Sequence, residues 1–307
     1  MSLANERVAY FNGEIMPESR VLIPFRDRGY KFGDAAFDVA RTFGGKVFKL
    51  REHVARLYRS LKYLRIDPGL TPEEMFRISE EVLERNRHLL DRDDDYWLAQ
   101  RISRGVDVVG GELWESGGPS VIVECTPLPL KPRARLFRDG VDIVLPSLRR
   151  VPPDSLSPNV KSHNYLNLVL GDLEVRSQNP DAWAILLDTR GYLCEGIGSN
   201  IFTVKEGTLY TPKSQYVLAG VTRETVLELA AECGIPAVEA DLSPYDGCTA
   251  DEAFITSTSF CVCPVRSING VTLGDGTVPG PVTKALTDAF ITLVDHDFVA
   301  QYTRHLS

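Results

Sequence analysis

Two segments of this 307-residue chain place an amine and a carboxylate where they could support chemistry. Lys161 follows a strand-like stretch and a Ser-Pro turn and precedes an amphipathic helix. Glu195 ends an apolar run, and Gly196 and Gly198 follow it, which permits close approach of the backbone to a ligand. An amine can form an imine with a carbonyl group. Taken alone, however, Lys161 is better explained as a solvated surface charge and Glu195 as part of an exposed hairpin turn.

Two further segments could bind an anion. Residues 220–222 lead into an expected helix, and the first N–H groups of a helix have no intrahelical partner. Ser257, Thr258 and Ser259 offer hydroxyl groups where an expected strand ends. The simpler interpretations are that Thr222 caps its helix and that the hydroxyl cluster only forms a turn.

Arg56 adds a cation to this set. It lies off the apolar stripe of its helix, so by itself it is a surface arginine whose removal should barely change stability. Together, the five features match what pyridoxal phosphate requires. The amine forms the imine, and the carboxylate keeps the pyridine nitrogen protonated so that the ring accepts electrons. The helix start, the hydroxyl groups and the arginine hold the phosphate.

Local patterns predict the elements that carry these residues. Asn12-Gly13 and Gly44-Gly45 each lie between apolar runs, which indicates two β-hairpins. Thr71 begins a capping box with proline at the first helical position. Apolar residues at helical spacing predict helices at 51–64, 165–176, 222–233 and 282–293.

The domain organisation follows from the distribution of these elements. Residues 126–134 contain three prolines, which favours an extended connector. We therefore expect a small N-terminal domain at 1–125, a linker at 126–134 and a larger, strand-rich domain at 135–307. Such a chain is of the α+β class, with a barrel-like second domain.

Composition excludes several classes of protein. The net charge of −8 argues against a nucleic-acid surface. The first residues lack the apolar core of a signal peptide, and no apolar run approaches the length of a membrane span, so a cytoplasmic protein is expected. Cys261 and Cys263 have no second Cys or His pair at zinc-like spacing, so no metal is expected.

The motifs resemble those of the class IV, or fold-type IV, pyridoxal-phosphate-dependent aminotransferases, and most closely the branched-chain group. The resemblance covers about residues 10–290. Its motifs are K-x-x-N-Y at 161–165, E-G-x-G-x-N at 195–200, G-V-T-R at 220–223 and G-P-V-T-K at 280–284. The family has a small α+β domain and a larger barrel-like domain, binds its cofactor between them and usually forms a homodimer.

The resemblance also implies roles for individual residues. Lys161 would be the Schiff-base lysine, Glu195 the partner of the pyridine nitrogen, and Tyr165 the donor to the ring hydroxyl oxygen. The residues implied to bind the phosphate are Arg56, Val221, Thr222, Ser257 and Thr258. The residues expected to line the substrate pocket are Phe32, Phe37 and Trp97.

The substrate class depends on weaker similarities. The 161–165 and 195–200 motifs resemble branched-chain enzymes, whereas residues 27–34 resemble D-amino-acid enzymes. Those enzymes carry an Arg-x-His pair where this chain has Val109 and Gly111, which disfavours D-amino acids. Ala99 replaces an arginine frequent in branched-chain enzymes, and Phe37-Asp38-Val39 resembles (R)-selective amine transaminases.

The sequence therefore favours transfer of an amino group between a branched-chain L-amino acid and a 2-oxo acid. An (R)-selective amine:pyruvate transaminase is the first alternative, and an aminodeoxychorismate-type lyase is the second, which Tyr165 disfavours. A non-catalytic binding protein of the same fold is the alternative from another class. Such a protein would be expected to lack Lys161 or Glu195, and both are present.

Overall fold

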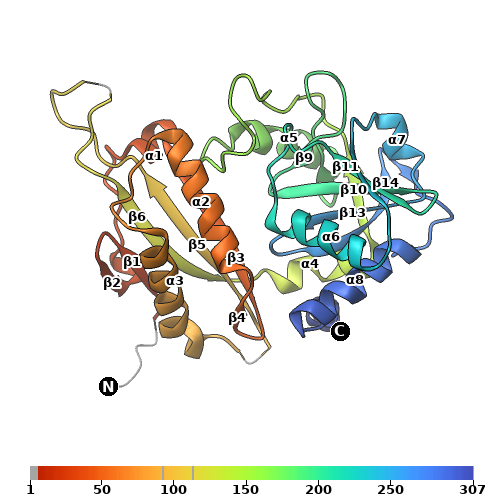
Figure 1. Ribbon diagram of the computed structural model, residues 1–307, viewed down its shortest axis with the longest axis horizontal. Helices are drawn as coiled ribbons and strands as arrows, with labels where there is room; N and C mark the ends of the chain where they lie inside the picture. Colours follow the sequence, from red (N-terminus) through yellow and green to blue (C-terminus); the bar gives the residue numbers. More distant parts are fainter. Residues whose placement is uncertain (1–5, 92, 113, 307) are drawn as a thin grey trace. The chain divides into compact units, whose positions relative to one another are not determined.

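A computed structural model describes residues 6–91, 93–112 and 114–306 (Figure 1). Residues 1–5 and 307, the ends of the two expected domains, lie outside the described part. The chain divides into two compact units. Unit 1 comprises residues 1–128 and 160–164, and unit 2 comprises residues 129–159 and 165–307. The α+β class inferred from the sequence is confirmed.

Unit 1 is built on a six-stranded sheet in the order β2-β1-β6-β5-β3-β4. The strands are β1 (Val8–Phe11), β2 (Glu14–Pro17), β3 (Ala35–Phe43), β4 (Lys46–Val47), β5 (Tyr96–Ser103) and β6 (Ser120–Pro127). Both predicted hairpins are present, as β1–β2 and β3–β4. Their turns need positive φ angles, at Asn12 (44°) and Gly13 (104°) and at Gly44 (55°) and Gly45 (80°), which asparagine and glycine tolerate best.

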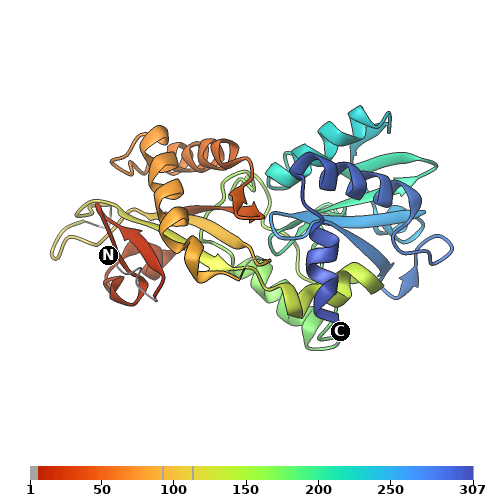
Figure 2. The same cartoon turned by 90° about the horizontal axis from the view of Figure 1, so that it is seen from below.

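Two amphipathic helices cover one face of this sheet (Figure 2). They are α2 (Leu50–Leu64) and α3 (Pro72–Asn86), and the short α1 (Arg28–Phe32) precedes β3. The predicted capping box at Thr71 and Glu74 is present. Because side chains alternate along a strand, Ala36 and Ala40 of β3 face the helices, while Phe37 and Val39 face the other way.

The chain returns to unit 1 after it has begun unit 2. In the segment 160–164, Lys161 O accepts from Phe37 N (2.9 Å), and His163 N donates to Ala35 O (3.0 Å). The segment thus lies along β3. The domain division expected from the sequence did not foresee this, because it assigned residues 160–164 to the second domain. The proline-rich stretch is also more structured than an open connector, since α4 (Leu130–Asp139) begins within it. Pro132 falls in the first turn, where its missing N–H has no intrahelical partner to lose.

Unit 2 is built on a nine-stranded sheet whose main path is β12-β11-β10-β13-β14-β7-β8, with β9 paired to β10 and β15 to β14. The strands are β7 (Val141–Val144), β8 (Trp183–Ala184), β9 (Glu195–Gly196), β10 (Ser199–Lys205), β11 (Thr208–Pro212), β12 (Ala237–Ala240), β13 (Glu252–Ser257), β14 (Cys261–Ile268) and β15 (Val271–Thr272).

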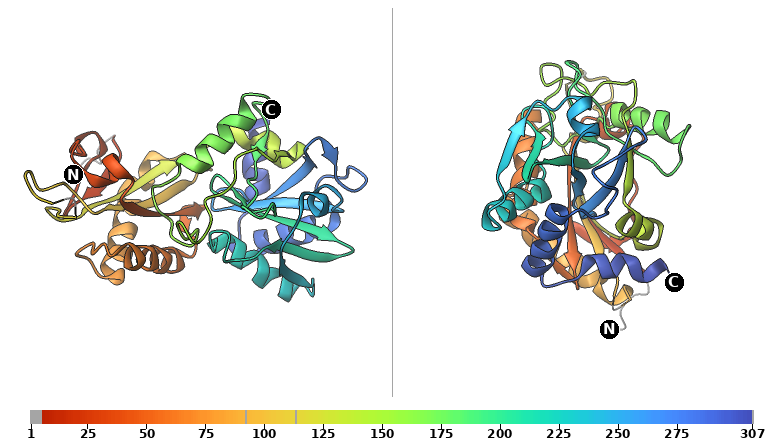
Figure 3. Two further views of the ribbon diagram at one scale, coloured as in Figure 1. Left: turned by 90° about the horizontal axis from the view of Figure 1, so that it is seen from above. Right: turned by 90° about the vertical axis from the view of Figure 1, so that its right-hand side faces the viewer.

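Helices cover both faces of the unit 2 sheet. In Figures 2 and 3, α6 (Val221–Glu232) and α8 (Pro281–Val294) lie on one side, and α4 and α5 (Leu166–Arg176) lie on the other. The three predicted helices of this unit are confirmed, and each of their ends agrees within one residue. The helices α7 (Pro244–Cys248) and α9 (Phe298–Thr303) are too short for a periodic apolar pattern to reveal them. Within the described residues, no helix combines the length and apolar character needed to cross a membrane.

Candidate active site

Lys161 is held against β3 and α2 within unit 1. Its backbone N–H donates to Ser60 Oγ (3.1 Å), and that hydroxyl donates to Arg56 O (3.2 Å) on the same helix. The Lys161 Nζ lies 4.6 Å from the centroid of the Phe37 ring. Lys161 is only half-buried, but its main chain is fixed by β3 on one side and by α2 on the other. The hydrogen-bonded main chain distinguishes Lys161 from the solvated surface lysine that its sequence position alone suggested.

Arg56 is not the surface arginine that its helical position suggested. It is 4% exposed and donates from Nε (2.8 Å) and Nη2 (2.7 Å) to the two oxygens of the fully buried Asp38. His53 Nδ1 lies 2.7 Å from the same carboxylate. Helical periodicity could not reveal this burial, because the α2 face that bears Arg56 packs on β3, whose Asp38 is polar.

The three groups set one another's ionisation. Burial alone would raise the pKa of Asp38, but the Arg56 guanidinium and the His53 hydrogen bond hold that pKa well below its usual range. Burial lowers the pKa of His53, and this outweighs the attraction of Asp38. The cluster is therefore a carboxylate–guanidinium pair beside a neutral imidazole, one residue along β3 from Phe37.

The three expected substrate-pocket residues differ in their surroundings. Phe37 is contacted by Lys161, by Arg101 and, edge to face at 5.3 Å, by His163. Trp97 is half-buried and, by alternation along β5, lies on the same face of the sheet as Arg101. Phe32 is 48% exposed at the end of α1.

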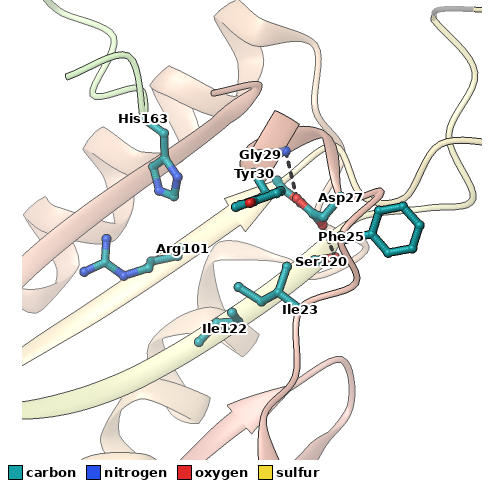
Figure 4. Close-up of a pocket in the computed structure, with 10 residues that line it drawn as sticks. Ile23, Phe25, Asp27, Gly29, Tyr30, Arg101, Ser120, Ile122 and His163 are labelled. Carbon is teal, nitrogen blue, oxygen red and sulfur yellow. Dashed lines mark hydrogen bonds between the residues drawn. The ribbon is translucent and has the colours of Figure 1, made fainter. Parts of the chain in front are cut away.

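A pocket of about 320 Å³ lies on this face of unit 1 (Figure 4). Arg101 and His163 lie at one end, Asp27 lies at the other, and Ile23 and Ile122 contribute an apolar wall. None of these five residues was singled out from the sequence. Alternation along β5 could have identified Arg101, but the approach of residue 163 to this strand depends on the tertiary fold.

In unit 2, Glu195 is buried, at 4% exposure, and is not part of an exposed turn. Its Oε1 accepts from Arg150 Nε (2.9 Å), and its Oε2 accepts from the Leu218 N–H (2.9 Å). A carboxylate has about four lone-pair positions, so each oxygen can accept one further hydrogen bond. Arg150 and Leu218 are the partners that sequence reasoning missed, because neither is close to Glu195 along the chain.

The start of α6 lies in the same unit and is joined to Glu195 through Leu218. Gly220 is the N-cap residue, and Val221 and Thr222 occupy the first two helical positions. The interpretation of Thr222 as the cap is therefore wrong, and no side chain of the described residues caps this helix. A Cβ on Gly220 would lie 2.3 Å from Asn200 Oδ1, so any larger residue would displace the Asn200 side chain.

The start of α8, in the same unit, differs from the start of α6 because a carboxylate of the protein already binds it. Its Val282 and Thr283 N–H groups donate to the two oxygens of Glu252, at 2.9 and 2.8 Å. An internal carboxylate thus already occupies the anion position of the G-P-V-T-K motif. The α6 start has no such side-chain cap among the described residues, which leaves it suited to a bound anion.

The remaining predicted residues also belong to unit 2. Ser257 ends β13, and its Oγ accepts from Phe260 N (3.0 Å). Thr258 is half-buried in the turn that follows. Tyr165 is the N-cap residue of α5 and packs against the apolar cluster around Leu168. The K-x-x-N-Y motif therefore crosses the boundary between the units, because Lys161 belongs to unit 1 and Tyr165 to unit 2.

These residues fit pyridoxal phosphate by the chemistry of their donors and acceptors. Unit 2 provides a buried carboxylate that keeps acceptor capacity and, two to four residues beyond its Leu218 partner, a helix start without a side-chain cap. Unit 1 provides a lysine amine fixed through its main chain and a buried guanidinium. The groups of unit 2 can bind a phosphate and accept a hydrogen bond from a protonated pyridine nitrogen, and those of unit 1 can supply an amine and a cation.

Comparison with known proteins defines the class. Residues 35–268 match the family model described as amino-transferase class IV, and the chain belongs to that family. Members of the family are pyridoxal-phosphate enzymes, so the chain is an amino-group transferase that uses this cofactor.

Individual proteins similar to this chain include aminotransferases of two substrate classes. A putative branched-chain-amino-acid aminotransferase of Methanocaldococcus jannaschii is 40% identical over 92% of this chain and 94% of its own length. A D-alanine aminotransferase of Bacillus licheniformis is 33% identical over 91% of this chain and 94% of its own. The structure of the branched-chain amino acid aminotransferase from Escherichia coli superposes with a TM-score of 0.83 at 30% identity, covering 94% of each chain.

Proposed function

We propose that this enzyme transfers the amino group of branched-chain L-amino acids to a 2-oxo acid, with 2-oxoglutarate as the leading acceptor. The observation that carries the proposal is the 40% identity to the putative branched-chain enzyme of M. jannaschii over nearly the whole of both chains. The E. coli structure supports it independently through the fold. A side chain without charge also suits the apolar wall of Ile23 and Ile122 in unit 1.

In this proposal each residue has one task. When bound, pyridoxal phosphate supplies the ring that accepts electrons from the substrate α-carbon. Lys161 would hold the cofactor covalently through Nζ, and its free amine would move the proton at the substrate α-carbon. Glu195, fixed by Arg150 and the Leu218 N–H, accepts from the pyridine nitrogen. Tyr165 donates to the ring oxygen.

The phosphate would be held by groups from several elements. The N–H groups of Val221 and Thr222 supply the helix start, and Ser257 and Thr258 supply the adjacent turn. Arg56 contributes a guanidinium that Asp38 already orients. We also infer that the active unit is a homodimer, which is supported by large apolar side chains exposed on unit 1, including Phe25, Tyr30 and Trp114 at 72–77%.

A spectrum and a substrate panel test this function. The purified protein with added cofactor should be yellow, and Lys161→Ala should lose the lysine-linked absorption band and essentially all turnover while phosphate contacts still bind the cofactor. L-leucine should outperform D-alanine and both enantiomers of a simple aryl amine. Activity retained by Lys161→Ala would contradict the role of Lys161, unless another lysine proved to be linked to the cofactor after borohydride reduction.

The same panel decides the main alternative. Phe37-Asp38-Val39 resembles the (R)-selective amine transaminases, and the structure buries Asp38 under Arg56. A clear preference for the (R)-aryl amine with pyruvate over L-leucine with 2-oxoglutarate would replace the proposed substrate class and leave the aminotransferase class intact.

A further inference from the structure

Two cations flank the Phe37 ring on the open face of the unit 1 sheet. Lys161 Nζ lies 4.6 Å from the ring centroid, and Arg101 Cζ lies 5.5 Å from it. The distance between Lys161 Nζ and Arg101 Cζ cannot exceed the sum of these two distances. A five-carbon 2-oxo acid whose carbonyl carbon is near Lys161 can therefore extend a distal carboxylate toward Arg101.

His163 provides a second polar group at the same end of the pocket. Its Nε2 is buried, yet it has no hydrogen-bond partner among residues 6–91, 93–112 and 114–306. Burial, together with the nearby Arg101 guanidinium, lowers the pKa of His163 to about 4, so the ring is neutral at pH 7. A neutral imidazole with one unpaired nitrogen can donate a hydrogen bond to a carboxylate. In Figure 4 the ring extends toward Arg101.

The acidic groups nearby leave room for such an anion. Glu124 accepts from Arg101 Nε (2.6 Å), which fixes the guanidinium through one nitrogen, and both side chains remain partly exposed. Asp27 lies at the other end of the pocket. Its oxygens already accept from Gly29 N (2.7 Å), Ser103 Oγ (2.8 Å) and Ser120 Oγ (2.7 Å).

We propose that Arg101, assisted by His163, binds the distal carboxylate of a dicarboxylic 2-oxo acid and so determines the choice of amino acceptor. Arg101 is a specificity residue of the proposed reaction and takes no part in proton transfer. The subsite rests on the proposed function for its biological substrate, but its chemistry can be tested with ligands that do not react.

The test compares two non-reacting carboxylates by calorimetry on the cofactor-loaded enzyme. Glutarate carries both carboxylates, whereas 4-methylpentanoate has one carboxylate and an apolar end. Arg101→Gln should weaken glutarate by about tenfold to a hundredfold, because a charge-assisted contact is lost, and should change 4-methylpentanoate by less than about twofold. Arg101→Lys should recover part of the loss, since it keeps the charge without the planar fork.

Two further variants provide a change in the opposite direction and a control. Glu124→Gln removes the competing anion, so it should tighten glutarate binding, in the direction opposite to Arg101→Gln. Arg77→Gln is the matched control, because Arg77 is an exposed arginine of α3, the helix that covers the other face of the sheet. It should change neither ligand.

Two results of this calorimetry would contradict the proposed subsite. Unchanged glutarate affinity in Arg101→Gln would overturn it, and so would an equal loss for both ligands, which would assign Arg101 to the carboxylate that all substrates share. Failure of the enzyme to accept L-leucine, combined with Arg101-dependent glutarate binding, would refute the proposed donor and leave the subsite standing.

Discussion

Among single residues, the Asp38 carboxylate shows how a charge is accommodated in the interior of unit 1. It is completely buried and receives two hydrogen bonds from Arg56 and one close contact from His53. A buried ion pair adds little net stability compared with apolar residues of the same size, but removal of one partner leaves an uncompensated charge. Arg56 therefore serves the fold as well as the proposed phosphate site.

We predict that Arg56→Ala destabilises the cofactor-free protein by about 3–5 kcal/mol, because Asp38 is left buried without its cation. The expectation from the sequence, that this change would barely affect stability, assumed an exposed arginine, and the structure contradicts that assumption. Urea unfolding of the cofactor-free form measures the effect. The double variant Asp38→Asn with Arg56→Ala should recover much of the loss, since no buried charge remains. A single variant as stable as the parent would contradict this account.

At the scale of elements, the start of α6 is assembled by contacts from three other segments. Glu195 accepts from Leu218 N, Asn159 Oδ1 accepts from Ala219 N (3.2 Å), and Asn200 Nδ2 donates to Leu218 O (3.1 Å). The helix start is consequently rigid before any anion binds. The E-G-x-G-x-N and G-V-T-R motifs are also in direct contact, because Asn200 of the first packs on Gly220 of the second.

We predict that Gly220→Ala weakens cofactor binding and lowers stability by about 1–3 kcal/mol, because the new Cβ would collide with Asn200 Oδ1. Cofactor titration by absorbance and thermal melting report the two effects separately. Gly117→Ala is the control, since its Cβ would have an ordinary contact, with Val106 O at 3.7 Å. If Gly220→Ala bound cofactor as tightly as the parent, the α6 start would not be the phosphate site.

At the scale of the whole molecule, the chain crosses between the two units more than once. Residues 160–164 extend the β3 side of unit 1, whereas the segments on both sides of them belong to unit 2. Lys161 is thus held in unit 1, and Glu195 and the α6 start in unit 2.

The proposed homodimer gives a prediction at this scale. Light scattering coupled to size-exclusion chromatography should give twice the mass of the chain, which is 34.1 kDa. Trp114→Glu, at a side chain 72% exposed in unit 1, should shift the mass toward the monomer, because it replaces an exposed apolar ring with a charge. Tyr245→Glu, 75% exposed in unit 2, is the matched control. A monomeric parent protein at micromolar concentration would contradict the dimer.

The local elements and the class of enzyme could both be predicted from the amino-acid sequence. The hairpin turns, the capping box at Thr71 and the amphipathic helices are encoded by residues within a few positions of one another, so their patterns could be interpreted directly. The four motifs were sufficient to identify the family, and through it the cofactor. The substrate class was left as an expectation, because it depends on the few side chains that line the pocket.

Contacts between residues that are far apart in the chain could not be predicted and are seen only in the folded protein. The burial of Arg56 depends on Asp38 in a neighbouring strand, and the fixed position of Glu195 depends on Arg150 and Leu218. Arg101 and His163 share a pocket because the segment at 160–164 returns to β3. Contacts of this kind depend on how whole elements pack, and neither helical nor strand periodicity carries information about packing partners that are far apart in the chain.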